Sequence, residues 1–171
     1  MLSKKQTRTL VFLGITAFVS LIYYSTRSSG PEYEVPDFVS ERTRAKEASG
    51  FDPSTHGYDP LIDIRDTLLK SPVVIFSKSY CPHSRFVKTL LTSQYRLDPP
   101  PVIRELDLDP HGHEIQDALL EISGRRTVPN VFVGGKSLGG GDEMRLLHSE
   151  NQLTTAFKKN GGRKFKVWKL N

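Results

Sequence analysis

The 171-residue sequence predicts an α/β domain with a mixed sheet between helices, preceded by a single N-terminal transmembrane helix. Between residues 60 and 160, short apolar runs typical of strands alternate with segments whose apolar residues recur every three or four positions, the spacing of a helix. This alternation implies right-handed crossovers and a sheet covered on both faces. An uncharged run at residues 9–26 precedes the domain, and the chain is long enough for one domain of about 100 to 120 residues plus extensions.

The N-terminal run has the length and the flanks of a membrane anchor. Its eighteen residues, 9–26, just span a hydrocarbon core of roughly 30 Å at ~1.5 Å per residue. Residues 1–8 are basic and the residues after the run are acidic, so the positive-inside rule predicts a cytoplasmic N-terminus and a domain in the lumen of the secretory pathway. A cleaved signal peptide is the alternative, with Thr26 and Ser28 as small residues near a cleavage site and Arg27 between them.

Two further segments flank the domain. Residues 27–59 are rich in charge, Ser, Pro and Gly, and are expected to form a flexible stem. Residues 161–171 form a basic C-terminal tail with interleaved apolar residues, which either contacts an anionic membrane surface or packs on the domain. The net charge of +5 is concentrated at the two ends of the chain, so nucleic-acid binding is not expected.

The first half of the domain, residues 60–160, is expected to hold two strands and two helices. Leu61, Ile64 and Leu68 share one face of a helix that ends before Pro72. A buried strand at residues 72–76 follows, then a helix that begins at Cys81. Residues 94–101 are predicted to be a loop, and residues 102–108 a strand.

The second half is expected to contain a helix, a hairpin and two more helices. Ile115, Leu119 and Ile122 form the inner face of a helix that Gly124 stops. Strands at residues 131–133 and 136–138 are joined by the two-residue turn Gly134-Gly135. A helix capped by Asp142 extends to Leu147, and a capping box of Ser149 and Gln152 begins the next.

Cys81 is the candidate nucleophile. It follows a buried strand and precedes Pro82, a residue suited to the first position of a helix. Free N–H groups and the positive end of the helix dipole favour a thiolate there, and Lys78 adds a positive charge. His83 is either simply exposed or, when protonated, a further cation beside the thiolate. The pair His111 and His113 is not expected to bind metal, because the two do not share a helix face and no third ligand has a suitable spacing.

Three motifs in this order resemble a glutaredoxin of the thioredoxin-like fold over about residues 60–160. They are Cys-Pro-His-Ser at 81–84, Thr-Val-Pro at 127–129 and the run Gly-Gly-Gly-Asp-Glu at 139–143. The resemblance implies a central mixed four-stranded sheet flanked by helices. It also implies a cis-proline at Pro129 and glutathione as the cofactor.

The resemblance departs from the family pattern at one informative place. The family usually has Cys-Pro-Tyr-Cys, and here the second cysteine is Ser84. Since Cys81 is the only cysteine of the chain, an outside thiol must resolve any mixed disulfide. Together with the N-terminal apolar run, the chain resembles membrane-anchored monothiol glutaredoxins of the fungal secretory pathway, which implies the endoplasmic reticulum or Golgi membrane.

The resemblance also assigns the residues around glutathione. The backbone of Val128, before Pro129, is expected to pair with the cysteinyl part, and Lys78 and Arg125 to hold the glycine carboxylate. The γ-glutamyl end is expected to meet the helix start, where N–H groups hold its carboxylate and Asp142 or Glu143 its amine. The full set of expected binding residues is Lys78, Tyr80, Arg125, Thr127, Val128, Pro129, Gly141, Asp142 and Glu143.

These assignments predict a glutathione-dependent thiol–disulfide oxidoreductase that deglutathionylates protein or small-molecule disulfides through Cys81. No metal site is expected in the chain alone. Two alternatives stay open. One is a homodimer that holds a [2Fe–2S] cluster through Cys81 and glutathione, against which Pro82 argues because cluster-binding members more often have Gly there. The other is a membrane-tethered redox sensor with negligible turnover.

Overall fold

A mixed four-stranded sheet forms the centre of the domain, as predicted. The computed structural model describes residues 57–170 and the separate positions 41, 44, 45 and 48, all of which belong to one structural unit, residues 31–171. The strand order is β3-β1-β4-β5. Strand β1 (Val73–Ser77) runs parallel to β3 (Val102–Glu105) and antiparallel to β4 (Asn130–Val133), and β4 forms a hairpin with β5 (Lys136–Ser137).

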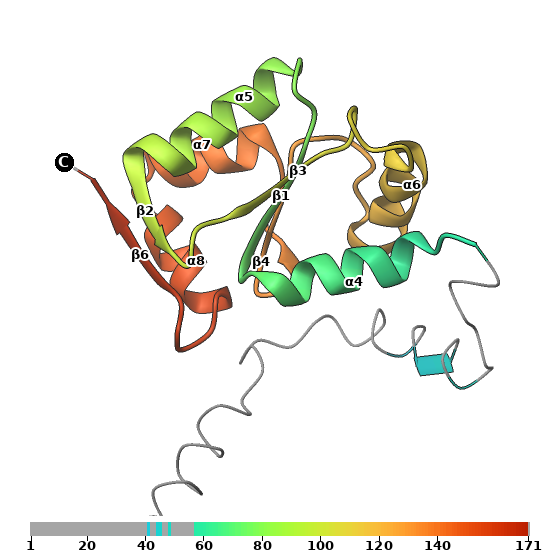
Figure 1. Cartoon of the computed structure of the whole chain (residues 1–171). Coiled ribbons are helices and arrows are strands. Elements are labelled where there is room, and N and C mark those ends of the chain that lie inside the picture. The colour runs from blue at the N-terminus through green and yellow to red at the C-terminus, as the bar shows by residue number, and fades with distance from the viewer. Residues whose placement is uncertain (1–40, 42–43, 46–47, 49–56, 171) are drawn as a thin grey trace, which may run out of the picture. The chain divides into compact units, whose positions relative to one another are not determined.

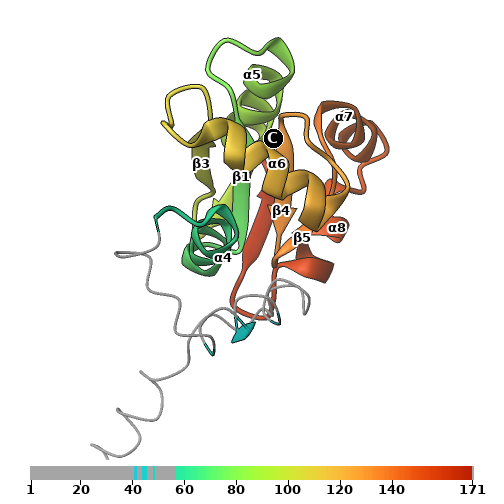
Figure 2. The same cartoon turned by 90° about the vertical axis from the view of Figure 1, so that its right-hand side faces the viewer.

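Helices cover both faces of this sheet (Figures 1 and 2). On one face lie α4 (Pro60–Lys70) and α6 (Gly112–Ser123). On the other lie α5 (Pro82–Thr89), α7 (Gly141–Ser149) and α8 (Leu153–Asn160). The sheet is therefore the middle layer of three.

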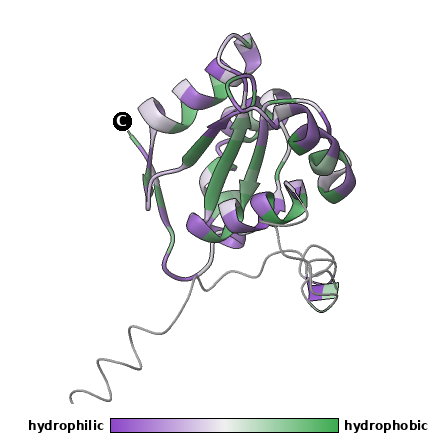
Figure 3. Ribbon diagram, turned by 45° about the vertical axis from the view of Figure 1, so that its right-hand side comes forward, coloured by the Kyte–Doolittle hydropathy of each residue, from purple (hydrophilic) through white to green (hydrophobic). Residues whose placement is uncertain are grey.

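The apolar residues of β1 explain this layering. Successive side chains of a strand point to opposite faces. Val73 and Ile75 pack with α5, α7 and α8, whereas Val74 and Phe76 pack with α4 and α6. Both faces of β1 are buried, which is why its sequence is apolar without alternation, and Figure 3 shows the central strands in the colour of hydrophobic residues.

The predicted loop at residues 94–101 is wrong in part, because it contains a strand. A π-helical turn, Leu90–Gln94, continues α5 into β2 (Tyr95–Asp98), which pairs antiparallel with β6 (Lys166–Lys169) to form a two-stranded ribbon. Tyr95 and Leu97 are buried, as is Val167 of β6. Of the two interpretations of residues 161–171, packing on the domain is thus observed for Phe165 and Val167.

Other boundaries also differ from the predictions. Strand β3 ends at Glu105 rather than at residue 108, because the Leu108 N–H donates to the Glu105 carbonyl and closes a turn. Helix α7 begins before Asp142, with Gly140 as its N-cap. The predicted capping box at Ser149 is absent: the Ser149 hydroxyl donates to the Leu146 carbonyl, and Gln152 is the N-cap of α8 without a side-chain hydrogen bond.

The predicted anchor cannot be located in this structure. Within the part of the chain that the structure describes, no helix has the length and apolar character needed to cross a bilayer. Residues 1–8, the predicted transmembrane residues 9–26 and most of the predicted stem, 27–59, lie outside the described residues.

Candidate functional site

Cys81 is at the junction of β1 and α5, as predicted. It is the N-cap of α5, with Pro82 at the first helical position, and its side chain is partly buried. The Arg85 N–H donates to the Cys81 carbonyl at 2.9 Å, the first hydrogen bond of the helix. The sulfur therefore lies at the end of the helix where the N–H groups lack intrahelical partners.

Asp107, a residue outside the three sequence motifs, fixes the turn before Cys81. Both the N–H and the hydroxyl of Ser79 donate to the Asp107 carboxylate, and the N–H bond is 2.8 Å long. These bonds hold the pKa of Asp107 below its ordinary value. Asp107 follows β3, the parallel neighbour of β1, and the carboxyl ends of parallel neighbours meet at one edge of a sheet. That rule is the sequence signal for this contact.

The Cys81 sulfur is surrounded by groups that favour the thiolate. Desolvation raises its pKa, but the N–H and the hydroxyl of Ser84, the N–H of His83 and the charge of Lys78 all lower it, and together they bring the pKa below its ordinary value. Lys78 was predicted to act in this way. The hydroxyl of Ser84 was not: this side chain is fully buried, and its oxygen also accepts the Lys78 N–H at 3.3 Å.

The Thr-Val-Pro segment lies against Cys81. The Val128 carbonyl oxygen is 3.9 Å from the Cys81 sulfur, and a protonated thiol can donate to it. The Val128–Pro129 peptide bond is cis, as the resemblance implied, and Pro129 is buried. Thr127 precedes Val128 in the chain and Tyr80 precedes Cys81, and both side chains are exposed.

The glycine run brings the start of α7 to the same place. Gly139 has a φ of 104°, a conformation that side chains disfavour. A Cβ on Gly140 would lie 2.7 Å from the Pro129 carbonyl oxygen, so only glycine allows this approach. A Cβ on Gly141 would lie 3.3 Å from Nδ1 of His83, so the imidazole contacts the first residue of α7. Thus α7 starts beside both the Cys-Pro-His-Ser motif at 81–84 and the Thr-Val-Pro segment at 127–129.

The structure pairs two predicted binding residues with each other. Arg125 forms an ion pair with Glu143, and the Glu143 carboxylate also accepts the Gly140 N–H at 2.7 Å. The Gly140 hydrogen bond is the main reason that the pKa of Glu143 is lowered, with Arg125 adding to it. Glu143 therefore caps α7, and Asp142, exposed and 3.1 Å from Arg145, is the carboxylate at the open end of that helix.

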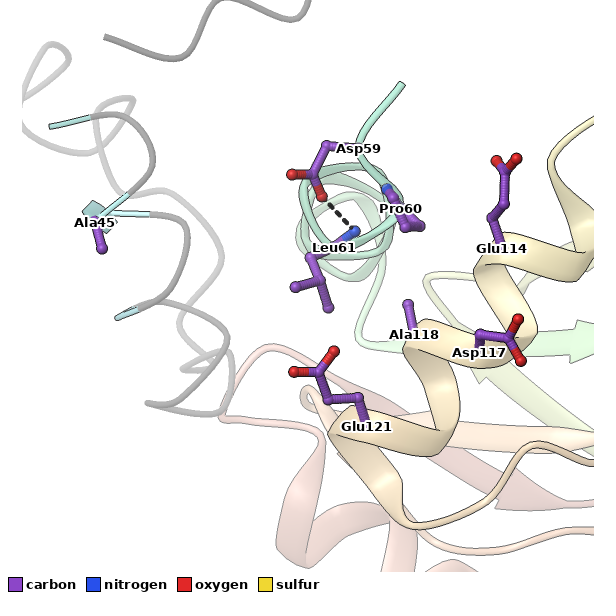
Figure 4. Close-up of a pocket in the computed structure, with 8 residues that line it drawn as sticks. All are labelled: Ala45, Asp59, Pro60, Leu61, Glu114, Asp117, Ala118 and Glu121. Atoms are coloured by element: carbon purple, nitrogen blue, oxygen red, sulfur yellow. Dashed lines mark hydrogen bonds between the residues drawn. The ribbon is translucent and has the colours of Figure 1, made fainter. Parts of the chain in front are cut away.

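Among the described residues, one surface hollow begins next to Cys81 in the chain and another lies away from it. A depression of about 340 Å³ extends along α5 from Pro82 past Phe86 to Gln94. A larger one, of about 620 Å³, lies between α4 and α6 and is lined by Asp59, Glu114, Asp117 and Glu121 among others (Figure 4). No predicted site residue lines the larger hollow, and several of its acids already have partners: Asp59 caps α4 and Asp117 pairs with Arg126.

The family model and the relatives that match this chain are all glutaredoxins. The family model described as Glutaredoxin matches residues 73–138. Monothiol glutaredoxin-7 of Saccharomyces cerevisiae is 38% identical over 137 residues, covering 79% of this chain and 66% of that protein. Monothiol glutaredoxin-3 of Schizosaccharomyces pombe is 47% identical over 88 residues, covering 52% of this chain and 53% of that protein. The chain therefore spans at most about two thirds of these two relatives.

Shorter relatives are covered almost completely. Glutaredoxin of Ricinus communis is 43% identical over 100 residues, which cover 57% of this chain and 92% of that protein. The crystal structure of a buckwheat glutaredoxin–glutathione complex is 36% identical, with a TM-score of 0.52, and covers 60% of this chain and 91% of that one. The similarity to these two shorter proteins covers 57% and 60% of this chain.

Proposed function

Because the chain belongs to the glutaredoxin family, we propose that it is a monothiol enzyme that removes glutathione from mixed disulfides through Cys81 alone. The observation that carries this proposal is the environment of Cys81. The only thiol of the chain is the N-cap of α5, its pKa is lowered, and a buried hydroxyl, Ser84, occupies the place of a second cysteine. One nucleophile and no internal resolving thiol require an outside thiol to complete turnover.

The reaction has two exchange steps. The Cys81 thiolate attacks the glutathione sulfur of a mixed disulfide, the bond between the two original sulfurs breaks, and the substrate leaves as a thiolate that takes a proton from water. A second glutathione thiolate then attacks the glutathione sulfur bound to Cys81. Glutathione disulfide leaves, and the Cys81 thiolate is restored.

The geometry offers complementary groups for glutathione. The backbone at Val128, next to the sulfur, would pair with the cysteinyl residue, and the open N-terminal end of α7 would receive the γ-glutamyl carboxylate. Asp142 is better placed than Glu143 for the γ-glutamyl amine, because the Glu143 carboxylate already bonds Gly140 and Arg125. If Arg125 binds the glycine carboxylate, it exchanges Glu143 for that carboxylate or shares itself between the two.

A turnover assay tests the proposal. The full chain is given a glutathione–cysteine mixed disulfide and reduced glutathione, and formation of glutathione disulfide is followed. Wild type should turn over and Cys81→Ser should not. Wild type without turnover, but with Cys81 readily glutathionylated, would support the redox-sensor alternative instead.

The cluster alternative is tested separately. Among the described residues, no group of three His, Cys, Asp or Glu side chains could hold a metal ion, so a [2Fe–2S] cluster would depend on Cys81, glutathione and a second copy of the chain. Visible absorbance and a dimer mass in freshly purified protein would support this alternative. Loss of both in Cys81→Ser would assign the cluster to this residue.

A further inference from the structure

The outer face of the β2–β6 ribbon is exposed, and the proposed reaction uses none of it. The inner side chains, Tyr95, Leu97 and Val167, are buried in the core. The side chains that alternate with them are exposed, and in the register Arg96 lies opposite Trp168. Trp168 is 45% exposed and Leu170, two residues on, is 46% exposed. The ribbon therefore presents an apolar tip beside basic residues.

The charge around this face is strongly one-sided. The segment from Lys158 to Leu170 contains no acidic residue and six basic ones, all exposed: Lys158, Lys159, Arg163, Lys164, Lys166 and Lys169. Some of this charge has local partners. Asp98 lies opposite Lys166 in the register, and the Lys169 ammonium donates to the Asn151 side chain at 2.8 Å. Asn151 carries no charge, and Arg96 and Asp98 cancel within β2, so the formal positive excess of the segment remains.

We propose that this face, the outer side of the β2–β6 ribbon with the basic residues around it, binds the surface of an anionic lipid bilayer. Clustered Lys and Arg side chains attract anionic headgroups, Trp prefers the interface between headgroups and hydrocarbon, and an adjacent exposed Leu gains by leaving water. Nucleic acid fits less well, because single-strand binders stack successive bases on several aromatic rings and this face offers one.

The position of the ribbon suits such contact. Helix α5 begins directly after Cys81, and the π-helical turn that continues it ends at Gln94, directly before β2. At ~1.5 Å per residue, these thirteen residues place the ribbon roughly 20 Å from Cys81. Figure 1 shows the ribbon at the opposite end of α5 from its start. A bilayer at the ribbon would thus leave the reactive sulfur open to water.

Trp168 is the only tryptophan of the chain, so its fluorescence reports on this face alone. We would reconstitute the full chain in unilamellar vesicles of phosphatidylcholine, or of an equal mixture of phosphatidylcholine and phosphatidylserine, neither of which contributes tryptophan. With phosphatidylserine we expect a blue shift of the emission and protection from acrylamide quenching. Raising the salt from about 0.1 M to about 1 M, which shortens the Debye length from about 10 Å to about 3 Å, should weaken both effects.

A matched pair of variants isolates the face. Arg96→Glu/Lys166→Glu reverses two charges on the ribbon and should abolish the blue shift. Lys70→Glu/Lys136→Glu makes the same change in net charge at two exposed positions on α4 and β5 and should preserve it. Cys81→Ser should also preserve it, so this test succeeds or fails independently of the proposed enzymatic function.

Three outcomes would overturn the proposal. The first is that the emission and quenching of Trp168 are the same with and without phosphatidylserine. The second is that the two charge-reversed variants lose the blue shift equally. Alternatively, soluble glycerophosphoserine or a single-stranded oligothymidine would protect Trp168 as well as the anionic vesicles do, which would identify a headgroup-sized anion or a nucleic acid instead of a membrane.

Discussion

At the scale of single residues, Ser84 is the instructive position. In the sequence, Ser84 is the position at which the usual glutaredoxin motif, Cys-Pro-Tyr-Cys, has its second cysteine. In the structure its buried hydroxyl and its N–H both lower the pKa of Cys81. A serine here therefore stabilises the Cys81 thiolate, whereas a cysteine could form a disulfide with Cys81. The nearby Lys78 acts through its charge. The proposed single-thiol mechanism and the lowered pKa of that thiol therefore depend on the same few atoms.

Substitutions at Cys81 and Ser84 test whether turnover needs a single thiol. Cys81→Ser should abolish turnover, whereas Ser84→Ala should keep most of it, because the reaction needs one thiolate and an external thiol. Ser84→Cys should slow glutathione-linked turnover, since a thiol one turn along α5 can capture the glutathionylated intermediate as an internal disulfide. Steady-state rates for the three variants check this. A Ser84→Ala variant as inactive as Cys81→Ser would contradict the mechanism.

The pH dependence of alkylation tests the activation of Cys81. Because the folded protein lowers the pKa of this thiol, its reaction with iodoacetamide should reach half its maximal rate at a pH below the free-thiol value of ~8.5. Lys78→Ala and Ser84→Ala each remove a group that favours the anion, so both should move the midpoint to higher pH. Lys78→Ala should also weaken glutathione binding. A wild-type midpoint at or above ~8.5 would rule out an activated thiolate.

At the scale of elements, the site is assembled by two segments that approach Cys81 from the other half of the domain. The Val128–Pro129 segment contacts the sulfur, and the close approach of Gly140 to the Pro129 carbonyl brings α7 beside it. The chain thus needs glycine at a position that makes no contact with the reacting atoms.

Gly140→Ala tests this arrangement. Its Cβ would meet the Pro129 carbonyl oxygen at 2.7 Å, so the start of α7 or the Pro129 segment must shift. We expect weaker glutathione binding and slower turnover. Gly57→Ala, at a φ of 84° with no neighbour within 4 Å, is the control: it strains the backbone before α4 and should lower stability while leaving glutathione affinity unchanged. Calorimetric titration with glutathione and thermal unfolding of both variants distinguish the two effects.

A second prediction at this scale concerns the contribution of the β2–β6 ribbon to the free energy of unfolding. Val167 is 1% exposed in the core shared with α5 and α8, so Val167→Ala should lower the free energy of unfolding by about 1–3 kcal/mol. Lys166→Ala, on the outer face of the same strand, should change it by no more than about 0.5 kcal/mol. Urea unfolding measures both. Equal, negligible effects would mean that β6 does not contribute to the folded core.

At the scale of the whole molecule, the prediction concerns topology. We expect residues 9–26 to remain as an uncleaved anchor, with the domain in the lumen of the secretory pathway, because the basic residues precede the apolar run and the acidic ones follow it. Protease added to sealed microsomes should spare the domain, and carbonate should leave it with the membrane. Digestion without detergent would indicate the reverse orientation, and release by carbonate with a new N-terminus near Ser29 would indicate a cleaved signal peptide.

The sequence by itself determined the parts of this protein whose signals are local. The apolar run of β1, the Cys-Pro start of α5 and the Gly-Gly hairpin each depend on neighbouring residues, and each is where the sequence predicts it. The order of the motifs likewise indicated the glutaredoxin family, and Cys81 remains the predicted nucleophile.

Only the tertiary structure decided what depends on distant partners. Strand β2 is short, lies among prolines and charges, and exists because β6 pairs with it from the far end of the chain. In the same way, the pairing of Arg125 with Glu143 joins residues far apart in sequence, and no local pattern predicts this pair. Local propensity and periodicity predict elements, but the partner of a strand edge or of a charge is chosen by packing of the whole domain.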